Sequence, residues 1–419
     1  MEGNKYNIAI ISATNIANPI DEEFGGGVYT HTKMLSKLLS DDANTVTHFV
    51  VNSNIRSDGK CIISESQYRD TKIIVFSNSI TPSKDNEGIY FQDYFNQLHA
   101  RIPFDIVISE GYYGYSLIKY PDIRDIMICI VHNFHLIHFH TNLMEVHGIR
   151  IFLIYLIKSV PALFYLIFKY EIPFMNASRL LISVSEINTK LLHCFYRIPK
   201  DKMRAIHNWV HTDIFHQDSD LRDRTRSELH IPADHTAFLV VGSMRKPKGF
   251  HIAIQAFVRF YQANRNSFLL IAGTGFGEQY IRSFVPENLK NNILFLGFCD
   301  RNRLPALYNA ADIFILPSLQ KEAHAYTLTE AMSCGLPVIA TNRGGNPEIL
   351  GDAGVLVPAN DPNALCHEML KLATNTLRMK ELSALARARV LDQFTSKTAL
   401  SNFKAAFNDI ISAKEAKDA

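Results

Sequence analysis

Two glutamates eight residues apart, Glu322 and Glu330, have the side chains and the spacing that most clearly suggest chemistry in this chain. They lie in the span 316–348, which reads LPSLQKEAHAYTLTEAMSCGLPVIATNRGGNPE. A carboxylate can accept hydrogen bonds from two hydroxyl groups at once. Glutamates at this spacing occur by chance in most proteins of this size. The flanking pattern is much rarer, because the pair stands between the Pro-Ser end of an apolar strand and a helix that ends in Cys-Gly-Leu-Pro.

This span resembles the donor-sugar site of a retaining glycosyltransferase of the large family 4. The resemblance implies an α/β protein with the GT-B fold, in which two doubly wound, Rossmann-like domains face each other across a cleft. It also implies a catalytic role for Glu322, which would contact hydroxyls of the donor sugar near the transferring carbon. Glu330 would bind the ribose of the nucleotide. The resemblance covers nearly the whole chain, is densest from 238 to 358 and is thin from 52 to 105.

A nucleotide sugar also requires cations, because negative charge grows on its diphosphate when the glycosidic bond breaks. Lys248, in the segment GSMRKPKG, stands six residues after Gly242, at the place of the family's diphosphate-binding lysine. Ser243 replaces the family's arginine, and Arg245 is the candidate for the arginine's role. A solvated basic turn is the alternative interpretation of Arg245 and Lys248.

Backbone groups would supply the remaining contacts to the donor. A helix that begins near Thr327 would point the N–H groups of Thr327 and Leu328 towards an anion. Phe298 and Cys299 occupy the position whose backbone reads the base in the family, with an ordinary strand end as the alternative. The family's Gly-Phe-Gly is replaced by residues 323–325, Ala-His-Ala, so the identity of the donor sugar does not carry over.

Histidines gather at the end of an apolar run in residues 128–135, ICIVHNFH. By the resemblance, His132 ends a strand and is a catalytic residue between donor and acceptor. His135 follows, and a strand with two-residue alternation would place His138 and His140 on one face, where they could bind zinc. No Asp or Cys ligand stands nearby in the sequence, and the family needs no metal for donor binding. We therefore predict no metal and no other cofactor.

The first half of the chain alternates strands and helices. Residues 7–11 are a continuous apolar run, the pattern of a strand buried on both faces. The glycines that follow, Gly25, Gly26 and Gly27, open a helix, and strand–glycine loop–helix is the first unit of a doubly wound domain. We expect Gly26 and Gly27 to allow a close approach of the backbone to the donor. Further β-rich runs predict a mostly parallel sheet. They cover residues 45–51, 73–76, 106–109, 126–131 and 180–183.

The α/β pattern restarts after a predicted boundary at residues 205–215, AIHNWVHTDIF. We predict an N-terminal acceptor-side domain at 1–210, a nucleotide-sugar-binding domain at 211–395, and a C-terminal helix at 396–419 that crosses back towards the first domain. The strands expected in the second domain are 238–242, 268–272, 293–296, 313–316 and 338–341, and its helices include 249–263, 362–373 and 375–393.

The composition excludes several classes of protein. A hydrophobic content of 47% and a charged content of 20% are typical of a soluble globular protein. The net charge of +2, with no basic helix or RNA-type aromatic motif, gives no reason to expect a nucleic-acid partner. The six cysteines have no short spacing between any two, which favours reduced thiols in a cytosolic setting. The N-terminal residues MEGNKYNIAIIS are typical of a strand and not of a signal peptide.

The segment 148–170, GIRIFLIYLIKSVPALFYLIFKY, departs from this soluble composition. Its apolar stretch nearly meets the roughly 20 residues that a membrane-spanning helix needs. Its Ile, Leu, Phe and Val side chains favour insertion by on the order of 5 kcal/mol, against about 3 kcal/mol for Lys158. Pro161 and Ser159 reduce the remainder, so insertion as a spanning helix is marginal.

Topology argues against a single crossing of a membrane by this segment. The flanking strands, 126–131 and 180–183, should share one sheet, and one crossing would place them on opposite sides of a bilayer. Two interpretations remain: a buried pair of core helices, or a surface that enters the lipid interface. Arg150, Lys158 and Lys169 would suit anionic headgroups, which favours the second.

These features together predict a retaining glycosyltransferase that moves a hexose-type sugar from a UDP- or GDP-linked donor to an acceptor hydroxyl. The acceptor would be a sugar or a lipid-linked sugar in cell-envelope polysaccharide or glycolipid assembly. The resemblance implies that a β-phosphate oxygen takes the acceptor's proton, so that no side-chain nucleophile is required. We expect a cytoplasmic protein that contacts the inner face of the membrane. Two other functions stay open: a catalytically silent GT-B subunit that binds a partner or ligand, and a GT-B sugar-nucleotide epimerase or phosphorylase.

Overall fold

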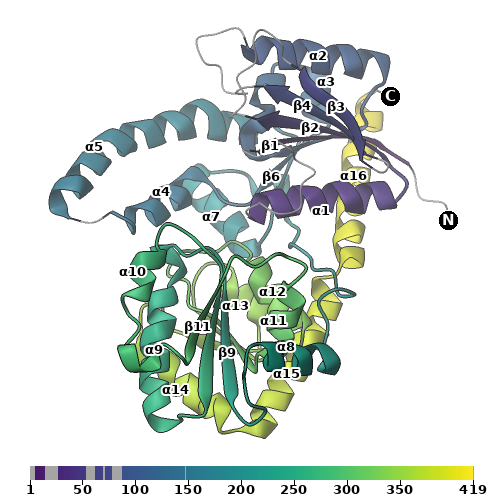
Figure 1. Ribbon diagram of the computed structural model, residues 1–419. Coiled ribbons are helices and arrows are strands. Elements are labelled where there is room, and N and C mark those ends of the chain that lie inside the picture. Colours follow the sequence, from purple (N-terminus) through teal and green to yellow (C-terminus); the bar gives the residue numbers. More distant parts are fainter. Residues whose placement is uncertain are drawn as a thin grey trace. The chain divides into compact units, whose positions relative to one another are not determined.

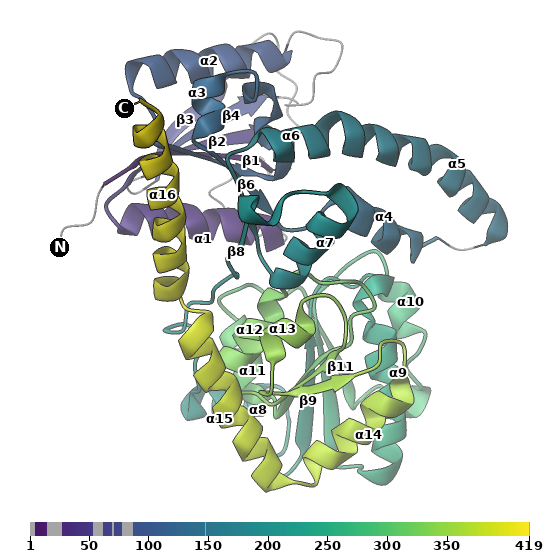
Figure 2. The ribbon, with the colours of Figure 1, turned by 180° about the vertical axis from the view of Figure 1, so that it is seen from behind.

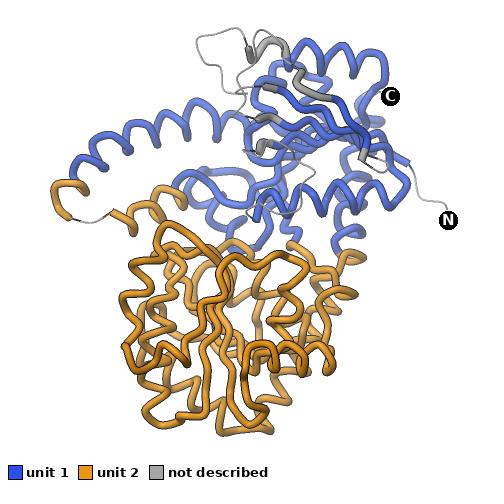
Figure 3. The backbone as a smooth tube through the Cα atoms, in the orientation of Figure 1, with its two compact units in different colours: residues 1–136, 153–207, 399–419 blue, residues 137–152, 208–398 orange. Residues whose placement is uncertain are grey.

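The computed structural model describes residues 5–14, 27–52, 62–68, 71–77, 87–146 and 148–418. The chain forms two compact units, which are coloured separately in Figure 3. The first unit comprises residues 1–136, 153–207 and 399–419, and the second comprises residues 137–152 and 208–398. The domain limits at residues 210 and 395 stay a prediction.

The first unit is built on an eight-stranded sheet of order β3-β4-β2-β1-β5-β6-β7-β8 (Figure 1). All neighbouring strands are parallel except the antiparallel pair β3–β4. Every residue of β5, β6 and β7 is buried, which explains why their sequences are continuous apolar runs. The strands are β1 (Asn7–Thr14), β2 (Thr45–Asn52), β3 (Ile62–Tyr68), β4 (Thr71–Ser77), β5 (Ile106–Glu110), β6 (Met127–Val131), β7 (Leu180–Ser183) and β8 (Met203–Ala205).

The helices that connect or follow these strands complete the predicted doubly wound pattern. The C-terminal helix α16 belongs to this unit from residue 399 onwards. The hydroxyl of Tyr6, the residue before β1, donates a hydrogen bond of 2.7 Å to Asn408 in this helix. The helices are α1 (Gly27–Asp41), α2 (Glu87–Arg101), η1 (Gly111–Leu117), α3 (Pro121–Asp125), α4 (His135–Leu143), α5 (Ile149–Leu166), η2 (Ile167–Glu171), α6 (Ile172–Ala177), α7 (Glu186–Tyr196), η3 (Lys200–Lys202) and α16 (Ser396–Asp418).

One prediction about the first half is wrong: His138 and His140 lie in helix α4 and not in a strand. In a helix, residues two positions apart point to different sides. The strand-based argument for a zinc pair therefore has no structural basis. A short segment such as HLIHFH (residues 135–140) fits the two-residue repeat of a strand as well as the 3.6-residue repeat of a helix. The sequence pattern alone could not decide between them.

Helix α5 corrects one of the two interpretations of the segment 148–170. The continuous helical stretch Ile149–Ala177 is long and apolar enough to cross a membrane, but only 11% of its most apolar 18-residue window is buried. A buried pair of core helices is therefore wrong. The predicted topology is confirmed, because β6 and β7 on either side of the segment are hydrogen-bonded parallel neighbours.

The second unit has a six-stranded, all-parallel sheet of order β11-β10-β9-β12-β13-β14. Alternate residues of β9 belong to different hydrophobic cores: Ala237 and Leu239 to one, Phe238 and Val240 to the other. Both faces of the sheet are therefore covered by helices. The strands are β9 (Thr236–Val241), β10 (Ser267–Ala272), β11 (Ile293–Gly297), β12 (Ile313–Leu316), β13 (Val338–Thr341) and β14 (Val355–Val357).

The helices of the second unit divide between these two faces, as Figure 1 and Figure 2 show from opposite sides. Helices α9 (Phe250–Ala263) and α14 (Pro362–Ala373) pack on one core, and α11 (Leu304–Ala310), α12 (Tyr326–Ser333) and α15 (Thr376–Gln393) on the other. The strands and helices predicted for this half are confirmed to within a few residues. The remaining helices are α8 (Ser219–Glu228), η4 (Lys246–Lys248), α10 (Glu278–Arg282), η5 (Glu287–Leu289) and α13 (Asn346–Leu350).

Candidate active site

The strand order places the predicted donor residues together in the second unit. β9 lies between β10 and β12, so the chain leaves β9 towards one side and returns on the other, and doubly wound sheets bind ligands at such a switch point. The loops that follow β9 and β12 carry Lys248 and Glu322. Gly249 lets these loops meet: its φ is +73°, and a Cβ atom there would lie 1.9 Å from the carbonyl oxygen of Pro317.

Lys248 and Glu322 form an ion pair at this point. Lys248 Nζ donates a hydrogen bond of 2.8 Å to Glu322 Oε1, and Ser318 Oγ and Gln320 Nε2 donate to the same oxygen at 2.8 and 2.9 Å. Burial favours the neutral carboxyl group, but Lys248, assisted by the two other donors, holds the pKa of Glu322 below its usual value. Among the described residues no hydrogen bond reaches Oε2, which can therefore accept a ligand hydroxyl.

The two glycines at the end of the motif hold the Glu322 backbone. Gly345 N donates 2.7 Å to Glu322 O. A Cβ atom on Gly344 or Gly345 would lie 2.1 Å from the carbonyl oxygen of Glu322 or Ala323, respectively. The loops that follow β12 and β13 therefore pack closely because residues 344 and 345 are glycines. The sequence motif alone did not reveal this reason for the two glycines.

Glu330 lies in α12 with only 1% of its surface exposed. The Tyr308 hydroxyl donates to its Oε2 at 3.0 Å, and Arg301 Nη2 lies 2.9 Å from its Oε1. Burial, and then the charge of Glu330, raise the pKa of Tyr308. The sequence argument missed Arg301 and Tyr308. The signal for Arg301 was its place two residues after Cys299, in the loop where the base-reading backbone was predicted.

The start of α12 presents backbone N–H groups as predicted, one residue earlier than expected. The helix begins at Tyr326, and the residue before it, Ala325, supplies no side-chain cap. The N–H group of Leu328 already donates 3.1 Å to Ala325 O, which leaves Thr327 as the better placed of the two predicted donors. Phe298 follows β11 with 52% of its surface exposed, so the alternative of a buried core side chain is wrong for it.

Arg245 is held by a carboxylate and is not a free, solvated side chain. Its Nε and Nη2 atoms each lie 2.9 Å from one oxygen of Glu145, and Nη2 donates to Asn142 at 3.3 Å. The guanidinium group also lies 5.5 Å from the ring centre of Phe276. The planar, two-pronged geometry is the one that arginine uses for carboxylates and phosphates alike. Arg245 can serve a diphosphate if the phosphate displaces Glu145.

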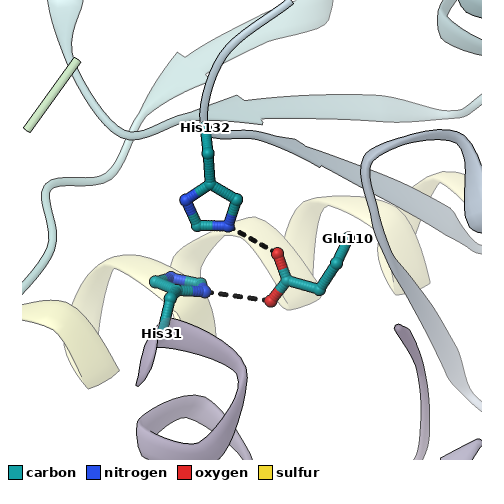
Figure 4. A group of neighbouring side chains, drawn as sticks. All are labelled: His31, Glu110 and His132. Atoms are coloured by element: carbon teal, nitrogen blue, oxygen red, sulfur yellow. Dashed lines mark hydrogen bonds and ion pairs between the residues drawn. The ribbon is translucent and has the colours of Figure 1, made fainter. Parts of the chain in front are cut away.

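In the first unit, three polar side chains meet at the corresponding switch point, between β1 and β5 (Figure 4). Glu110 ends β5, His132 follows β6, and His31 lies in α1, the helix after β1. His132 Nε2 lies 2.6 Å from Glu110 Oε2, and His31 Nδ1 lies 2.9 Å from Oε1. Glu110 has no exposed side-chain surface. The structure therefore brings the predicted His132 together with two residues that sequence reasoning missed.

Burial would raise the pKa of Glu110, but His31 and His132 hold it well below its usual value. Burial lowers the pKa of His31, although the neighbouring Glu110 carboxylate raises it. The facing ligand atoms of the three residues lie within 4.8 Å of one another, close enough to consider a metal ion. Each histidine nitrogen is nevertheless at hydrogen-bonding distance from its own carboxylate oxygen. Of the two predicted glycines, Gly27 is the exposed first residue of α1, and Gly26 lies outside the described residues.

Comparisons with known proteins agree with this arrangement. Residues 222–389 match the family model described as glycosyl transferases group 1. N-acetyl-alpha-D-glucosaminyl L-malate synthase of Bacillus anthracis is 26% identical over 218 residues, covering 51% of this chain and 55% of that protein. The first three curated relatives are matched over only 48% to 60% of their own length. The chain thus spans about half the length of these relatives.

Solved structures match over nearly the whole chain. Sucrose-phosphate synthase from Thermosynechococcus elongatus superimposes with a TM-score of 0.76 at 18% identity, covering 97% of this chain and 99% of that one. Anabaena HepE in complex with UDP-glucose has a TM-score of 0.69 at 16% identity and covers 96% and 99%. At such low identity these similarities establish the GT-B fold and nothing about the substrate.

Proposed function

We propose that this chain, which has the GT-B fold and whose residues 222–389 match the family model described as glycosyl transferases group 1, is a retaining glycosyltransferase. It would transfer a hexose-type sugar from a UDP- or GDP-linked donor to an acceptor hydroxyl. The observation that carries the proposal is the partly buried Lys248–Glu322 pair at the β9/β12 switch point, with the buried Glu330 on helix α12. Anabaena HepE, which shares the fold, binds UDP-glucose, and this supports a nucleotide-sugar donor.

Each residue would act through the chemistry of its side chain. Lys248 and the N–H group of Thr327 would neutralise the diphosphate as its charge grows. Oε2 of Glu322 would accept a hydroxyl of the donor sugar, and Glu330 would accept the ribose hydroxyls. A β-phosphate oxygen would take the acceptor's proton while the new bond forms on the face that the nucleotide leaves. No metal or other cofactor is part of this proposal.

Incubation of the purified protein with a panel of nucleotide sugars tests the proposal. Slow hydrolysis of one donor is expected, and NMR of the released sugar should show that its first-formed anomer has the donor's configuration. Inversion would contradict the retaining mechanism. Binding of nucleotide without any turnover would favour a silent subunit, and formation of an epimer or a sugar phosphate would favour an epimerase or phosphorylase.

We further propose that α5 contacts the lipid interface and that the acceptor is lipid-linked, as in cell-envelope polysaccharide or glycolipid assembly. Burial is confined to the end of α5 and to the turn η2 that follows it, where Leu163, Ile167 and Tyr170 are buried. The exposed surface is largely apolar: Ile157 is 73% and Phe168 62% exposed. A bilayer interface is the partner that would cover such a surface while Arg150, Lys158 and Lys169 meet anionic headgroups.

Vesicle co-sedimentation tests this contact. The parent protein should bind anionic vesicles and lose that binding as salt rises, because part of the attraction is electrostatic. The double variant Ile157→Gln, Phe168→Gln should lose vesicle binding and stay folded, since both side chains are exposed. Leu377→Gln, at an exposed leucine on α15, is the matched control and should bind like the parent. Failure of the parent to bind anionic vesicles would remove the basis for a lipid-linked acceptor.

A further inference from the structure

We propose that Glu110 is a positioning residue that fixes the proton of His132 on Nε2 and presents its Nδ1 lone pair to the reacting groups. His31 is the second donor that keeps the Glu110 carboxylate in place. The role in the reaction rests on the proposed glycosyl transfer, but the positions of the protons do not. Figure 4 shows the arrangement, with the second ring nitrogen of His132 directed away from Glu110.

The hydrogen-bond geometry determines which nitrogen atoms carry protons. An ionised carboxylate only accepts hydrogen bonds, so both ring nitrogens that face it must be N–H donors. His132 Nε2 lies 2.6 Å from Oε2 and His31 Nδ1 lies 2.9 Å from Oε1. The two histidines are thus held in opposite tautomers. In neutral His132 the lone pair is then on Nδ1, and in neutral His31 it is on Nε2.

Two further contacts restrict the His132 ring. Asn188, a buried side chain of α7, donates 2.9 Å from Nδ2 to the backbone oxygen of His132. The edge of one imidazole packs on the face of the other, with ring centroids of His31 and His132 4.5 Å apart at an interplanar angle of 73°. The ring is therefore fixed by its backbone, by its face and by Nε2. A side chain held in this way is oriented before a substrate arrives.

A buried Glu110 without these donors would be costly. Its side chain has no contact with solvent, and an isolated buried carboxylate takes up a proton instead of staying charged. The low pKa of Glu110 agrees with two N–H donors on one carboxylate. The same logic of a carboxylate that orients a histidine for chemistry on its other nitrogen operates in catalytic triads.

A bound metal ion is the competing explanation, and it requires the opposite proton positions. A metal held by His31 Nδ1 and His132 Nε2 would need both atoms deprotonated, which would move the proton of His31 to Nε2 and that of His132 to Nδ1. The two explanations therefore predict different tautomers for both residues.

The experiment is ¹⁵N NMR of the ring nitrogens in protein labelled at histidine, without any donor or acceptor. Signals of the two residues are identified by their loss in His31→Asn and His132→Asn. We expect His31 protonated at Nδ1 and His132 at Nε2. The Glu110→Gln amide accepts on one side and donates on the other, so one of the two histidines should reverse its tautomer. Glu171→Gln, at a buried glutamate whose Oε1 lies 3.2 Å from His135 Nδ1, is the control and should leave both tautomers unchanged.

Steady-state kinetics then distinguishes a role of Glu110 in positioning His132 from a role in fold stability alone. With a verified donor, Glu110→Gln should lower kcat roughly 10- to 100-fold, the usual range for a residue that orients a functional histidine, with little change in the donor KM. His31→Asn keeps an N–H donor near the position of Nδ1 and should retain most activity, whereas His31→Leu should not.

The outcomes keep this proposal distinct from the proposed function. If both histidines show the expected tautomers but the protein turns over no nucleotide sugar, the positioning of His132 is supported and glycosyl transfer is contradicted. An active parent in which Glu110→Gln keeps its kcat and its histidine tautomers would overturn the positioning role. Stoichiometric metal in the purified protein, lost in Glu110→Gln, together with the reversed tautomers in the parent would overturn it as well.

Discussion

The two units place polar side chains at the same point of the same kind of sheet, but their carboxylates have different hydrogen-bond partners. In the second unit Glu322 pairs with Lys248, Glu330 with Arg301 and Glu145 with Arg245. In the first unit Glu110 pairs with His31 and His132. Lysine and arginine stay charged over the whole working range of pH, whereas histidine changes charge near neutrality.

This difference indicates a division of labour. A diphosphate is a permanent anion, and permanent cations bind it without dependence on proton uptake. A hydroxyl group of the acceptor or of the donor sugar is uncharged, and a neutral histidine with one free lone pair can accept a hydrogen bond from it. The permanently charged lysine and arginines thus belong to the unit predicted to hold the nucleotide. The two histidines belong to the unit predicted to hold the acceptor.

The largest expected effect comes from removing the cation or the ribose carboxylate in the second unit. Lys248→Ala and Glu330→Gln should each reduce turnover about a hundredfold or more, because contacts that strengthen in the transition state contribute roughly 2–4 kcal/mol. Steady-state kinetics on a verified donor measures this, normalised to the folded fraction. Lys246→Ala, at the other lysine of η4, is the matched control. Near-normal turnover of either variant would show that the assignment of that residue is wrong.

The second prediction concerns pH and the stability of the Lys248–Glu322 pair. In the parent the depressed pKa of Glu322 means that its stabilising contribution is present above the unfolded pKa and is lost as pH falls through the folded pKa. Lys248→Met leaves the carboxylate buried without its cation, so the pKa of Glu322 should rise above its usual value. We expect a destabilisation of about 3 kcal/mol at pH 7 that shrinks as the carboxyl group becomes protonated at lower pH.

Urea denaturation of the parent and variant at pH 7 and pH 4.5 measures this change. The double variant Lys248→Met, Glu322→Gln should recover most of the loss at pH 7, because it no longer buries an unpaired charge. A cost that is the same at both pH values would mean that Lys248 stabilises the loop by packing and not by its charge.

The smallest expected effect tests the first unit. His132→Ala should lower turnover roughly tenfold, which corresponds to about 1.4 kcal/mol of lost transition-state stabilisation, while nucleotide affinity measured by calorimetry stays nearly unchanged. The reason is that Lys248, Thr327 and Glu330, which are predicted to bind the diphosphate and the ribose, belong to the second unit. Chelator treatment of the parent should not change its activity. Loss of nucleotide binding in His132→Ala would contradict the division of labour between the units.

The donor residues could be predicted from the sequence because they lie close together along it. Glu322 and Glu330 stand in one span with the strand end and the helix that position them, and Lys248 follows its own strand after one short loop. Local periodicity and turn residues were sufficient to predict these elements. The alternation of apolar runs likewise predicted two mostly parallel sheets, because strands buried on both faces have few polar residues.

The partners of these residues were decided by the tertiary structure. His31 and Glu110 are 79 residues apart, and they meet only because β1 and β5 are neighbours in the sheet. Arg301, in the loop between β11 and α11, contacts Glu330 in helix α12. The sequence made α5 apolar all round, but only the tertiary structure shows that its end at Leu163 is buried while most of the helix stays uncovered. Residue types and local spacing determine which groups can react, whereas the order of the strands determines which of them share a site.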